Sequence, residues 1–281
     1  MGVSDQEVKL FIDEVKSNST YDFSGYSDKS LKRRIERLLI ENKVNLNGLI
    51  LKIRRDNTFL EQVVKDVTVN TTELFRDPEV WQEIRHRVLN KLKDLPTINI
   101  WHAGCSTGQE VYSLTIMLNE MGIFNKCNIY ASDLNTDVLD FAKKGIYKYR
   151  FNLSYLSNFD EVIKENKYNY TETTEVSYDK YFQIDKKNDK IIMNDFLLKK
   201  PFFEKIDLVK MENLFYKKFD IILCRNVLIY FNLELQNKVI NFFHDNLTTN
   251  GFLILGKHES LLGYPENKFD KKGKFYKKKD L

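Results

Sequence analysis

The feature that most constrains the fold is an apolar strand that runs into a glycine turn and then into a helix. Residues 98–108 read INIWHAGCSTG, the helical pattern QEVYSLTIML follows, and a second apolar run, NIYASDLN, carries the acid Asp133 near its end. In doubly wound α/β folds this arrangement binds a nucleoside cofactor, with the acid on the ribose hydroxyls. The chain is therefore expected to bind a small adenosine-type molecule.

From Ile98 onward, short apolar strands alternate with helical patterns, which predicts βαβ units and a Rossmann-like, doubly wound α/β sheet. The predicted strands are INIWHA (98–103), NIYASDL (128–134), KIDLVKM (205–211), FDIILCRN (219–226) and GFLILG (251–256), with FYKKK (275–279) as an antiparallel closer. The predicted helices are EVYSLTIMLNEM (110–121), TDVLDFAKKGI (136–146) and LELQNKVINFFHDNL (233–247).

The first seventy residues predict a separate, small, all-helical domain. Apolar residues recur at helical spacing in four groups, which indicates four short amphipathic helices. Asn57 is a candidate cap for the fourth helix, and Asp77 followed by Pro78 is a start signal for a further helix that links the two parts. The expected domains are therefore a helical domain at 1–70 and a larger cofactor domain at 71–281.

Between Tyr149 and Lys200 the alternation of strands and helices gives way to a polar stretch rich in Tyr, Asn and Lys. It ends in a pattern typical of a β-hairpin, with its turn around Asn188 and Asp189. This insertion, at about residues 150–200, is either a decorated surface loop or a docking flap, since long insertions in compact domains often carry function.

Composition excludes several other classes of protein. With 281 residues and 42% hydrophobic content the chain can bury a full core. No apolar run approaches the roughly 18 residues of a membrane span and no signal peptide is recognisable, so a cytoplasmic location is expected. A net charge of +4, from 44 basic and 40 acidic residues, does not indicate nucleic-acid binding. The four histidines lack metal-site spacing, so no metal is expected, and the three cysteines are expected to be buried free thiols.

The spacing of the glycines bears on the identity of the cofactor. Only Gly104 and Gly108 are present, which makes a poor cradle for the pyrophosphate of a nicotinamide dinucleotide. S-adenosylmethionine has no phosphate, and needs an acid for its ribose and partners for its ammonium and carboxylate. Asp133 is the candidate for the ribose, Glu110 for the amino-acid end and Arg76 for the carboxylate. The alternatives are that Glu110 merely favours a helix N-terminus and that Arg76 forms an interdomain salt bridge.

A further motif, FDIILCRNVLIYF at 219–231, should deliver polar groups at the carboxyl end of a central strand. With this motif the sequence resembles the CheR-type chemotaxis receptor methyltransferases. The matching pieces cover nearly the whole chain in the family's order: NTTELFRD, WHAGCSTGQEVYS, YASDLNTDVLDFAKKGIY and CRNVLIYF.

The resemblance implies an enzyme that uses S-adenosyl-L-methionine to convert glutamate side chains of receptor cytoplasmic helices into methyl esters for chemotactic adaptation, with S-adenosyl-L-homocysteine as product. Two departures from the family's STGEEPYS pattern are Gln109 and Val111, beside the retained Glu110. Asn213 and Leu214 take the place of the family's Asn-Leu pair, within a divergent segment. The remaining cofactor contacts implied are Asn70, Thr72, Arg76, Glu110, Asp133, Asn226 and Val227.

Methyl transfer to a carboxylate needs no general base, because a glutamate with a pKa of about 4.3 is already ionised near neutral pH. Alignment of the oxygen with the methyl carbon should dominate catalysis. By analogy with the family, Tyr230 is the candidate for positioning the acceptor carboxylate; the alternative is that its ring packs beside the adenine.

Basic residues gather between positions 29 and 37, and Lys29, Arg33 and Arg37 share one face at i, i+4 spacing. Receptor methylation helices present clustered glutamates, so this face is a candidate docking surface, although a plain solvated face has the same pattern. The expected partner is the cytoplasmic domain of a methyl-accepting chemoreceptor, with the enzyme monomeric and recruited to membrane receptor arrays. Two alternatives stay open, namely the same transfer to a different acceptor and a cofactor-binding sensor or scaffold without turnover. A nicotinamide dehydrogenase is a more distant alternative.

Overall fold

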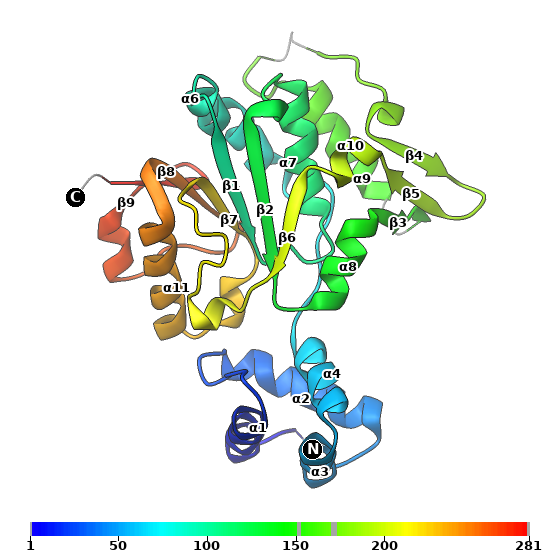
Figure 1. Cartoon of the computed structure of the whole chain (residues 1–281), viewed down its shortest axis with the longest axis vertical. Coiled ribbons are helices and arrows are strands. Elements are labelled where there is room, and N and C mark those ends of the chain that lie inside the picture. Colours follow the sequence, from blue (N-terminus) through cyan, green and yellow to red (C-terminus); the bar gives the residue numbers. More distant parts are fainter. Residues whose placement is uncertain (1, 151–152, 170–172, 280–281) are drawn as a thin grey trace.

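The computed structural model describes residues 2–150, 153–169 and 173–279. Four helices near the N-terminus form a small domain beneath a larger α/β domain, and one extended segment after α4 joins the two (Figure 1). The two domains meet at the end of the central sheet that carries the loop between β2 and α8.

The helical domain confirms the four predicted helices, which are α1 (Asp5–Asn18), α2 (Asp28–Asn42), α3 (Leu46–Arg55) and α4 (Asn57–Val67). Their apolar stripes bury one another in a core of their own. The predicted cap of α4 was wrong by one residue. Asp56, not Asn57, is the N-cap, because its carboxylate accepts from the backbone N–H of Thr58 at 2.9 Å and of Phe59 at 3.1 Å.

The central sheet confirms the doubly wound α/β prediction. Its strand order is β6-β2-β1-β7-β8-β10-β9, in which the first five strands are parallel and the last two antiparallel. The strands are β1 (Ile98–Ala103), β2 (Cys127–Asp133), β6 (Pro201–Lys205), β7 (Phe219–Cys224), β8 (Leu247–Leu255), β9 (Phe269–Lys272) and β10 (Phe275–Lys278). The main helices are α7 (Gln109–Glu120), α8 (Thr136–Lys144) and α11 (Leu233–Asn246).

One predicted strand was wrong in position. The strand is β6, Pro201–Lys205, and the end of the predicted KIDLVKM segment forms a 3-10 turn at Leu208–Lys210. The Asp207 carboxylate accepts from the backbone N–H of Val209 at 2.9 Å, and this local bond favours the turn over an extended chain. β6 begins with proline and leaves Phe202 55% exposed, as befits the edge of a sheet.

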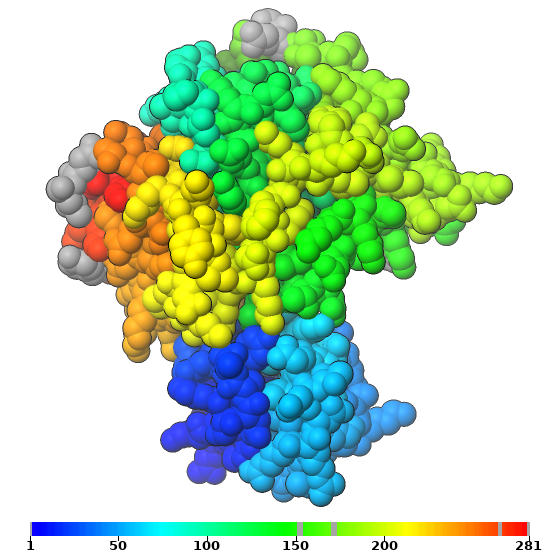
Figure 2. Space-filling view, viewed as in Figure 1, coloured from blue at the N-terminus to red at the C-terminus, as the bar shows by residue number. Residues whose placement is uncertain are grey.

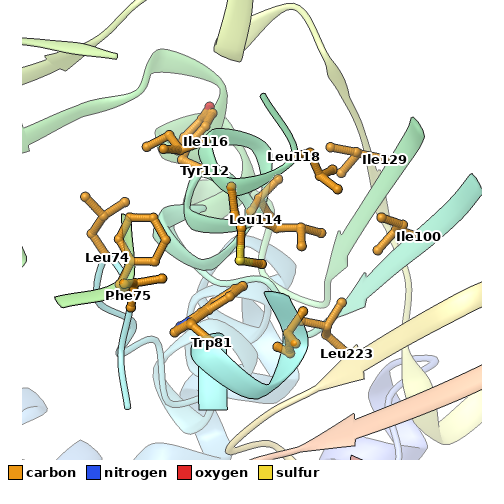
Figure 3. Close-up of a cluster of buried hydrophobic side chains, with 14 of the residues drawn as sticks. Leu74, Phe75, Trp81, Ile100, Tyr112, Leu114, Ile116, Leu118, Ile129 and Leu223 are labelled. Carbon is orange, nitrogen blue, oxygen red and sulfur yellow. The ribbon is translucent and has the colours of Figure 1, made fainter. Parts of the chain in front are cut away.

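Helix α7 is buried on almost every side, which fixes the glycine turn before it. Leu114, Ile116 and Leu118 pack in a cluster that also holds strand residues Ile100 and Ile129 (Figure 3). The linker helix predicted after Asp77 is present as α5 (Pro78–Glu83), a π-helical segment (Ile84–Leu89) and α6 (Asn90–Leu92), and it buries Trp81 completely in the same cluster.

The insertion contains the predicted hairpin. β4 (Phe182–Asp185) and β5 (Lys190–Met193) pair antiparallel, and β3 (Ile146–Lys148) completes a separate three-stranded sheet. Its helical segments are α9 (Leu153–Phe159), a π-helical turn (Asp160–Lys164), a 3-10 turn (Tyr178–Lys180) and α10 (Asp195–Leu198). Residues 151–152 and 170–172 of the insertion lie outside the described residues. In the described ranges, no helix is both long and apolar enough to cross a bilayer.

Candidate active site

A cleft lies where the carboxyl ends of β1, β2 and β7 meet the helical domain. In the space-filling view the helical domain, blue to cyan, is seated against this end of the α/β domain (Figure 2). The cleft encloses about 820 Å³, open solvent included. Both domains line it; the helical domain and the linker after it contribute Tyr26, Ser30, Leu31, Arg34 and residues 67–71.

The glycine turn brings backbone to the cleft wall. Gly104 has a φ of +84°, and a Cβ there would lie 2.5 Å from Cγ2 of Val227, so only glycine fits. Asp133, at the end of β2, accepts from the backbone N–H of Ser106 at 2.9 Å and of Asn135 at 3.0 Å. Burial raises the pKa of the Asp133 carboxyl, although these backbone bonds oppose the shift. The predicted ribose acid is thus held in one orientation beside the turn.

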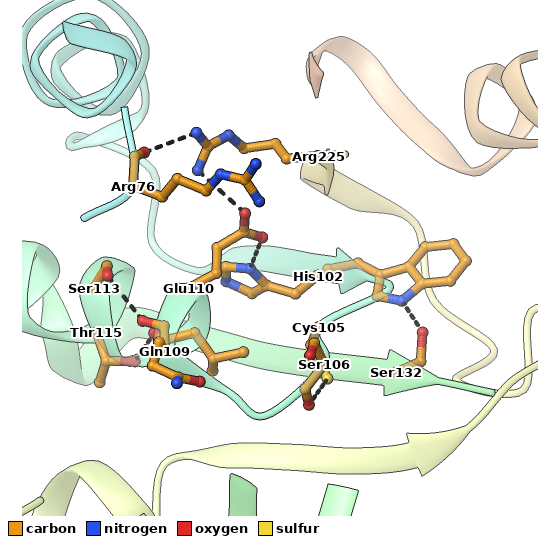
Figure 4. A network of polar contacts seen from close by, with 12 residues as sticks. Arg76, His102, Cys105, Ser106, Gln109, Glu110, Ser113, Thr115, Ser132 and Arg225 are labelled. Atoms are coloured by element: carbon orange, nitrogen blue, oxygen red, sulfur yellow. Dashed lines mark hydrogen bonds and ion pairs between the residues drawn. The ribbon is translucent and has the colours of Figure 1, made fainter. Parts of the chain in front are cut away.

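Glu110 lies behind this wall in a buried ionic network (Figure 4). Its carboxylate meets Nδ1 of His102 at 2.9 Å and a guanidinium nitrogen of Arg225 at 3.2 Å. Burial alone would raise the pKa of Glu110, but the His102 bond and the Arg225 charge outweigh it and hold the pKa below its ordinary value. Glu110 is therefore ionised, and His102 donates from Nδ1. Glu110 therefore does more than favour the N-terminus of α7, since it also pairs with His102 and Arg225.

Arg225 is a functional candidate that the sequence motif contains but to which no role was assigned from sequence. Besides Glu110, its guanidinium donates to Asp77 at 2.9 Å and to the carbonyl of Arg76 at 2.8 Å, and it stacks over Trp81. The signal in the sequence was the position of Arg225 at the carboxyl end of a predicted central strand. Arg76 itself has no ion pair with any residue in the described ranges, so the interdomain salt bridge considered for it is not seen, and its charge stays available to a ligand.

Tyr230 lines the cleft in an electropositive setting. Burial raises the pKa of its hydroxyl, while the charges of Arg34, Arg33 and Arg76 act in the opposite direction. Arg34 also lines the cleft, its Nε is buried without a partner among the described residues, and burial lowers its pKa. The helical spacing that singled out Lys29, Arg33 and Arg37 passed over Arg34, which lies about 100° further round the same helix.

The loop that carries Asn226, Val227 and Tyr230 is held by the half-buried carboxylate of Glu259, which the sequence did not single out. Glu259 accepts from the backbone N–H of Asn226 and of Gly256, both at 2.7 Å, and of Ile229 at 3.2 Å. Asn226 has a φ of +60°, which a non-glycine residue adopts only when its surroundings enforce it. The hydrogen bond from the Asn226 N–H to Glu259 holds Asn226 in this conformation.

The structure brings some of the predicted site residues to the cleft and leaves others outside its lining. Asn213 and Leu214 are among those outside: the Asn213 amide donates to the carbonyl of Lys217 and to Asn246, both at 2.7 Å. Asp207 and Leu208, which follow β6, line the cleft instead. The lining contains Asn70, Asp133, Asn226, Val227 and Tyr230, whereas Thr72, Arg76, Glu110, Asn213 and Leu214 are not part of it.

The remaining predicted positions have clear surroundings. Gln109, where the family usually has an acid, accepts from the Thr107 hydroxyl at 2.7 Å and donates to the Tyr155 hydroxyl at 3.2 Å, so a neutral amide satisfies this position. The docking candidates Lys29, Arg33 and Arg37 are all exposed on α2, and Arg37 forms a surface pair with Glu41 at 2.7 Å.

The two domains are joined by backbone hydrogen bonds at the cleft itself. The N–H of Ser27 donates to the carbonyl of Tyr230, and the N–H of Asn232 donates to the carbonyl of Gly25, both at 2.8 Å. Tyr26 and Phe231 thereby form an isolated antiparallel bridge, and their rings pack edge-on. The helical domain is thus a wall of the site rather than a separate appendage.

Comparisons with known proteins agree with this geometry. Residues 70–276 match the family described as CheR methyltransferase, SAM binding domain, and residues 6–68 match its all-alpha domain. A Pseudomonas putida protein named as the methyltransferase Cher3 is 34% identical over 92% of this chain and 90% of its own. A chemotaxis protein methyltransferase of Borreliella burgdorferi is 28% identical over 94% and 91%.

Among solved structures, the N-methyltransferase NodS of Bradyrhizobium japonicum, in complex with S-adenosyl-L-homocysteine, aligns over 71% of this chain and 72% of its own, with 13% identity and a TM-score of 0.35. The family match covers both domains and includes the residues of the glycine turn, the acid at the end of β2 and the loop after β7. This chain belongs to the CheR methyltransferase family and is an S-adenosylmethionine-dependent methyltransferase.

Proposed function

We propose that this enzyme methylates glutamate side chains on the cytoplasmic helices of a chemoreceptor. The observation that carries the proposal is the setting of Tyr230, whose hydroxyl borders the cleft within the field of Arg33, Arg34 and Arg76. The positive charges of these three arginines act on the hydroxyl and favour an anionic acceptor, and a glutamate carboxylate has that charge near neutral pH.

The residues present fit S-adenosylmethionine better than a dinucleotide. Asp133 offers a fixed carboxylate to ribose hydroxyls, and the close approach of Gly104 to Val227 leaves no room for a side chain in the turn. Asp207 and Leu208 take the place proposed for Asn213 and Leu214, since they line the cleft at the end of β6. Arg76 remains the candidate partner of the cofactor's carboxylate, with Glu110 behind it. When bound, the cofactor supplies a methyl group on a positively charged sulfur.

The chain's own residues then have two tasks. Tyr230 and Arg34 hold one carboxylate oxygen of the acceptor in line with the methyl carbon, and the domain wall around Tyr26 and Phe231 limits the access of water. No residue has to remove a proton from the acceptor. Bound cofactor would supply the methyl group and leave as a neutral thioether, and the acceptor would leave as a methyl ester.

Docking of the receptor helix is assigned to α2. Lys29, Arg33 and Arg37 are exposed on the same helix that delivers Arg34 to the cleft, so an acidic helix lying on them would be close to the reacting carboxylate. We propose that a monomer acts in the cytoplasm beside receptor arrays. Because this face recognises charge rather than a particular sequence, transfer to another acidic protein is the second candidate.

The test begins with calorimetric titration of S-adenosyl-L-homocysteine into the wild type and Asp133→Ala, with NAD in parallel. Micromolar binding that the substitution abolishes is expected. Radiolabelled methyl transfer to a receptor cytoplasmic fragment follows, with a matched fragment whose candidate glutamates are changed to glutamine. Label on the first fragment alone supports the proposal. Binding without label on either fragment would remove the receptor assignment and favour another acceptor or a sensor without turnover.

A further inference from the structure

Tyr26 has a hydroxyl group without a hydrogen-bond partner among the described residues. The residue lies in the loop between α1 and α2 of the helical domain and lines the cleft. A tyrosine hydroxyl taken out of bulk water normally finds a partner, because an unpaired polar group there costs free energy. Tyr26 is half-buried, so its hydroxyl can take a hydrogen-bond partner from among the molecules that enter the cleft.

The ring of Tyr26 is held from both domains. It packs edge-on against Phe23 of the helical domain, at 4.9 Å between centroids, and against Phe231 of the α/β domain, at 5.1 Å. The backbone bridge to Phe231 fixes the main chain as well. A Cβ on Gly25 would lie 2.7 Å from the side chain of Leu235, so the chain approaches α11 as closely as glycine permits. The side chain is thus held beside the cleft on a rigid support, which lowers the cost of binding a ligand.

Different charges act on the hydroxyls of the two tyrosines that line the cleft. The Tyr230 hydroxyl lies in the field of Arg33, Arg34 and Arg76. Burial first, and then the carboxylates of Asp207 and Asp133, raise the pKa of the Tyr26 hydroxyl far above its ordinary value. Tyr26 therefore carries a protonated hydroxyl that is influenced by Asp133, the carboxylate assigned to the ribose, whereas the arginines act on Tyr230.

We propose that Tyr26 is a cofactor-binding residue contributed by the helical domain, whose hydroxyl hydrogen-bonds the adenosine part of S-adenosylmethionine. The inference rests on the assignment of the cofactor to this cleft and goes beyond the contacts implied by the family motifs, all of which lie at or after Asn70. It makes the loop between α1 and α2 part of the cofactor site.

The test compares Tyr26→Phe with the wild type by calorimetry, using S-adenosyl-L-homocysteine and 5′-methylthioadenosine, which lacks the amino-acid end. The expected result is a Kd about five-fold weaker for both ligands, as befits the loss of one neutral hydrogen bond. Tyr21→Phe is the matched control. The Tyr21 hydroxyl also joins the domains, accepting from Lys205 at 2.7 Å and donating to Glu61 at 2.9 Å, but it does not line this cleft. Its substitution should leave both Kd values unchanged.

Three outcomes would overturn the inference. Equal Kd values for Tyr26→Phe and the wild type would show that the hydroxyl binds nothing on the cofactor. Weaker binding of S-adenosyl-L-homocysteine with unchanged binding of 5′-methylthioadenosine would move the contact to the amino-acid end. Failure of the wild type to bind either ligand would remove the cofactor from the cleft and the proposed function with it, whereas the first two outcomes leave that function standing. A thermal melt of each variant confirms that both tyrosine substitutions leave the protein folded.

Discussion

Arg225 donates a hydrogen bond to Glu110 at 3.2 Å, joining the end of β7 to the first turn of α7 across 115 residues of sequence. The Arg225 side chain is 2% exposed and the Glu110 side chain 12%, so the pair is shielded from solvent. Asp77 at 2.9 Å adds the linker before α5 to the same guanidinium. One cation thus fixes three segments around the floor of the cleft.

Replacement of Arg225 by methionine should destabilise the protein strongly. The carboxylates of Glu110 and Asp77 would lose their cation while remaining largely buried, a change that costs about 3–5 kcal/mol in typical buried pairs. Arg37→Met is the matched control, because Arg37 pairs with Glu41 at the surface, and such pairs contribute about 0–1 kcal/mol. Urea denaturation of both variants gives the comparison. If both variants lost the same free energy of unfolding, the ion pairs of Arg225 would contribute no more than a surface pair.

The stabilising contribution of Glu110 should depend on pH in a definite direction. Its folded pKa lies below the ordinary value of 4.5, so the unfolded chain binds the proton more readily. The contribution is therefore fully present above 4.5 and is lost as the pH falls through the folded pKa. The stability advantage of the wild type over Glu110→Gln should shrink as the pH is lowered from 7 into this range. Denaturation curves of both proteins across the range test the sign, and an advantage that grows on acidification would contradict it.

Gly104→Ala should weaken cofactor binding as well as stability. The new methyl group would meet Cγ2 of Val227 at 2.5 Å, in a backbone with a φ of +84°. Gly122 has a φ of +69°, but nothing lies within 4 Å of the place a Cβ would take, so Gly122→Ala imposes similar backbone strain without the clash. Strain of this kind costs on the order of 1–3 kcal/mol. Thermal melts should show a loss for both variants, whereas only Gly104→Ala should bind S-adenosyl-L-homocysteine more weakly.

Two parts of α2 should affect the reaction differently. Neutralising Lys29, Arg33 and Arg37 together should raise KM for the receptor and leave cofactor affinity unchanged, because these side chains lie outside the cofactor cleft lining. Arg34→Ala should lower kcat as well, since Arg34 borders the cleft beside Tyr230. Steady-state kinetics with a receptor fragment separate the two effects. An unchanged KM in the triple variant would remove the docking surface, and an unchanged kcat for Arg34→Ala would remove its role in positioning.

Most of the architecture could be predicted because the pattern and the burial coincide. The segment INIWHA is almost wholly buried in β1, and the apolar stripes of α1 to α4 face one another, so their periodicity reports the structure directly. The β6 segment could not be located this way. The strand begins with Pro201 and exposes Phe202, which is not typical of a buried strand. The segment after it has the stronger strand pattern, but the Asp207 side chain stabilises a turn there.

The candidate site was predictable where a residue follows a strand, and not where it depends on tertiary contact. Asp133 and Asn226 come directly after or at the end of parallel strands, whose carboxyl ends meet by necessity. Glu259 and Tyr26 belong to loops with no period. Only the folded chain shows that Tyr26 lines the cleft and that Glu259 holds the loop of Asn226 beside it. Asn213 and Leu214 were implied only by the resemblance to the family's Asn-Leu pair, in a divergent segment, and the cleft lining contains Asp207 and Leu208 instead.

The bridge between Tyr26 and Phe231 makes closure of the two domains and occupancy of the cleft a single thermodynamic equilibrium. A molecule that touches both walls binds only the docked arrangement, so its apparent affinity includes the fraction of molecules already docked. By the same linkage, each occupant holds the helical domain in place, and hydrogen exchange at the N–H groups of Ser27 and Asn232 would slow in proportion to saturation. A bound molecule would thus also fix the basic helix α2 in its position beside the cleft.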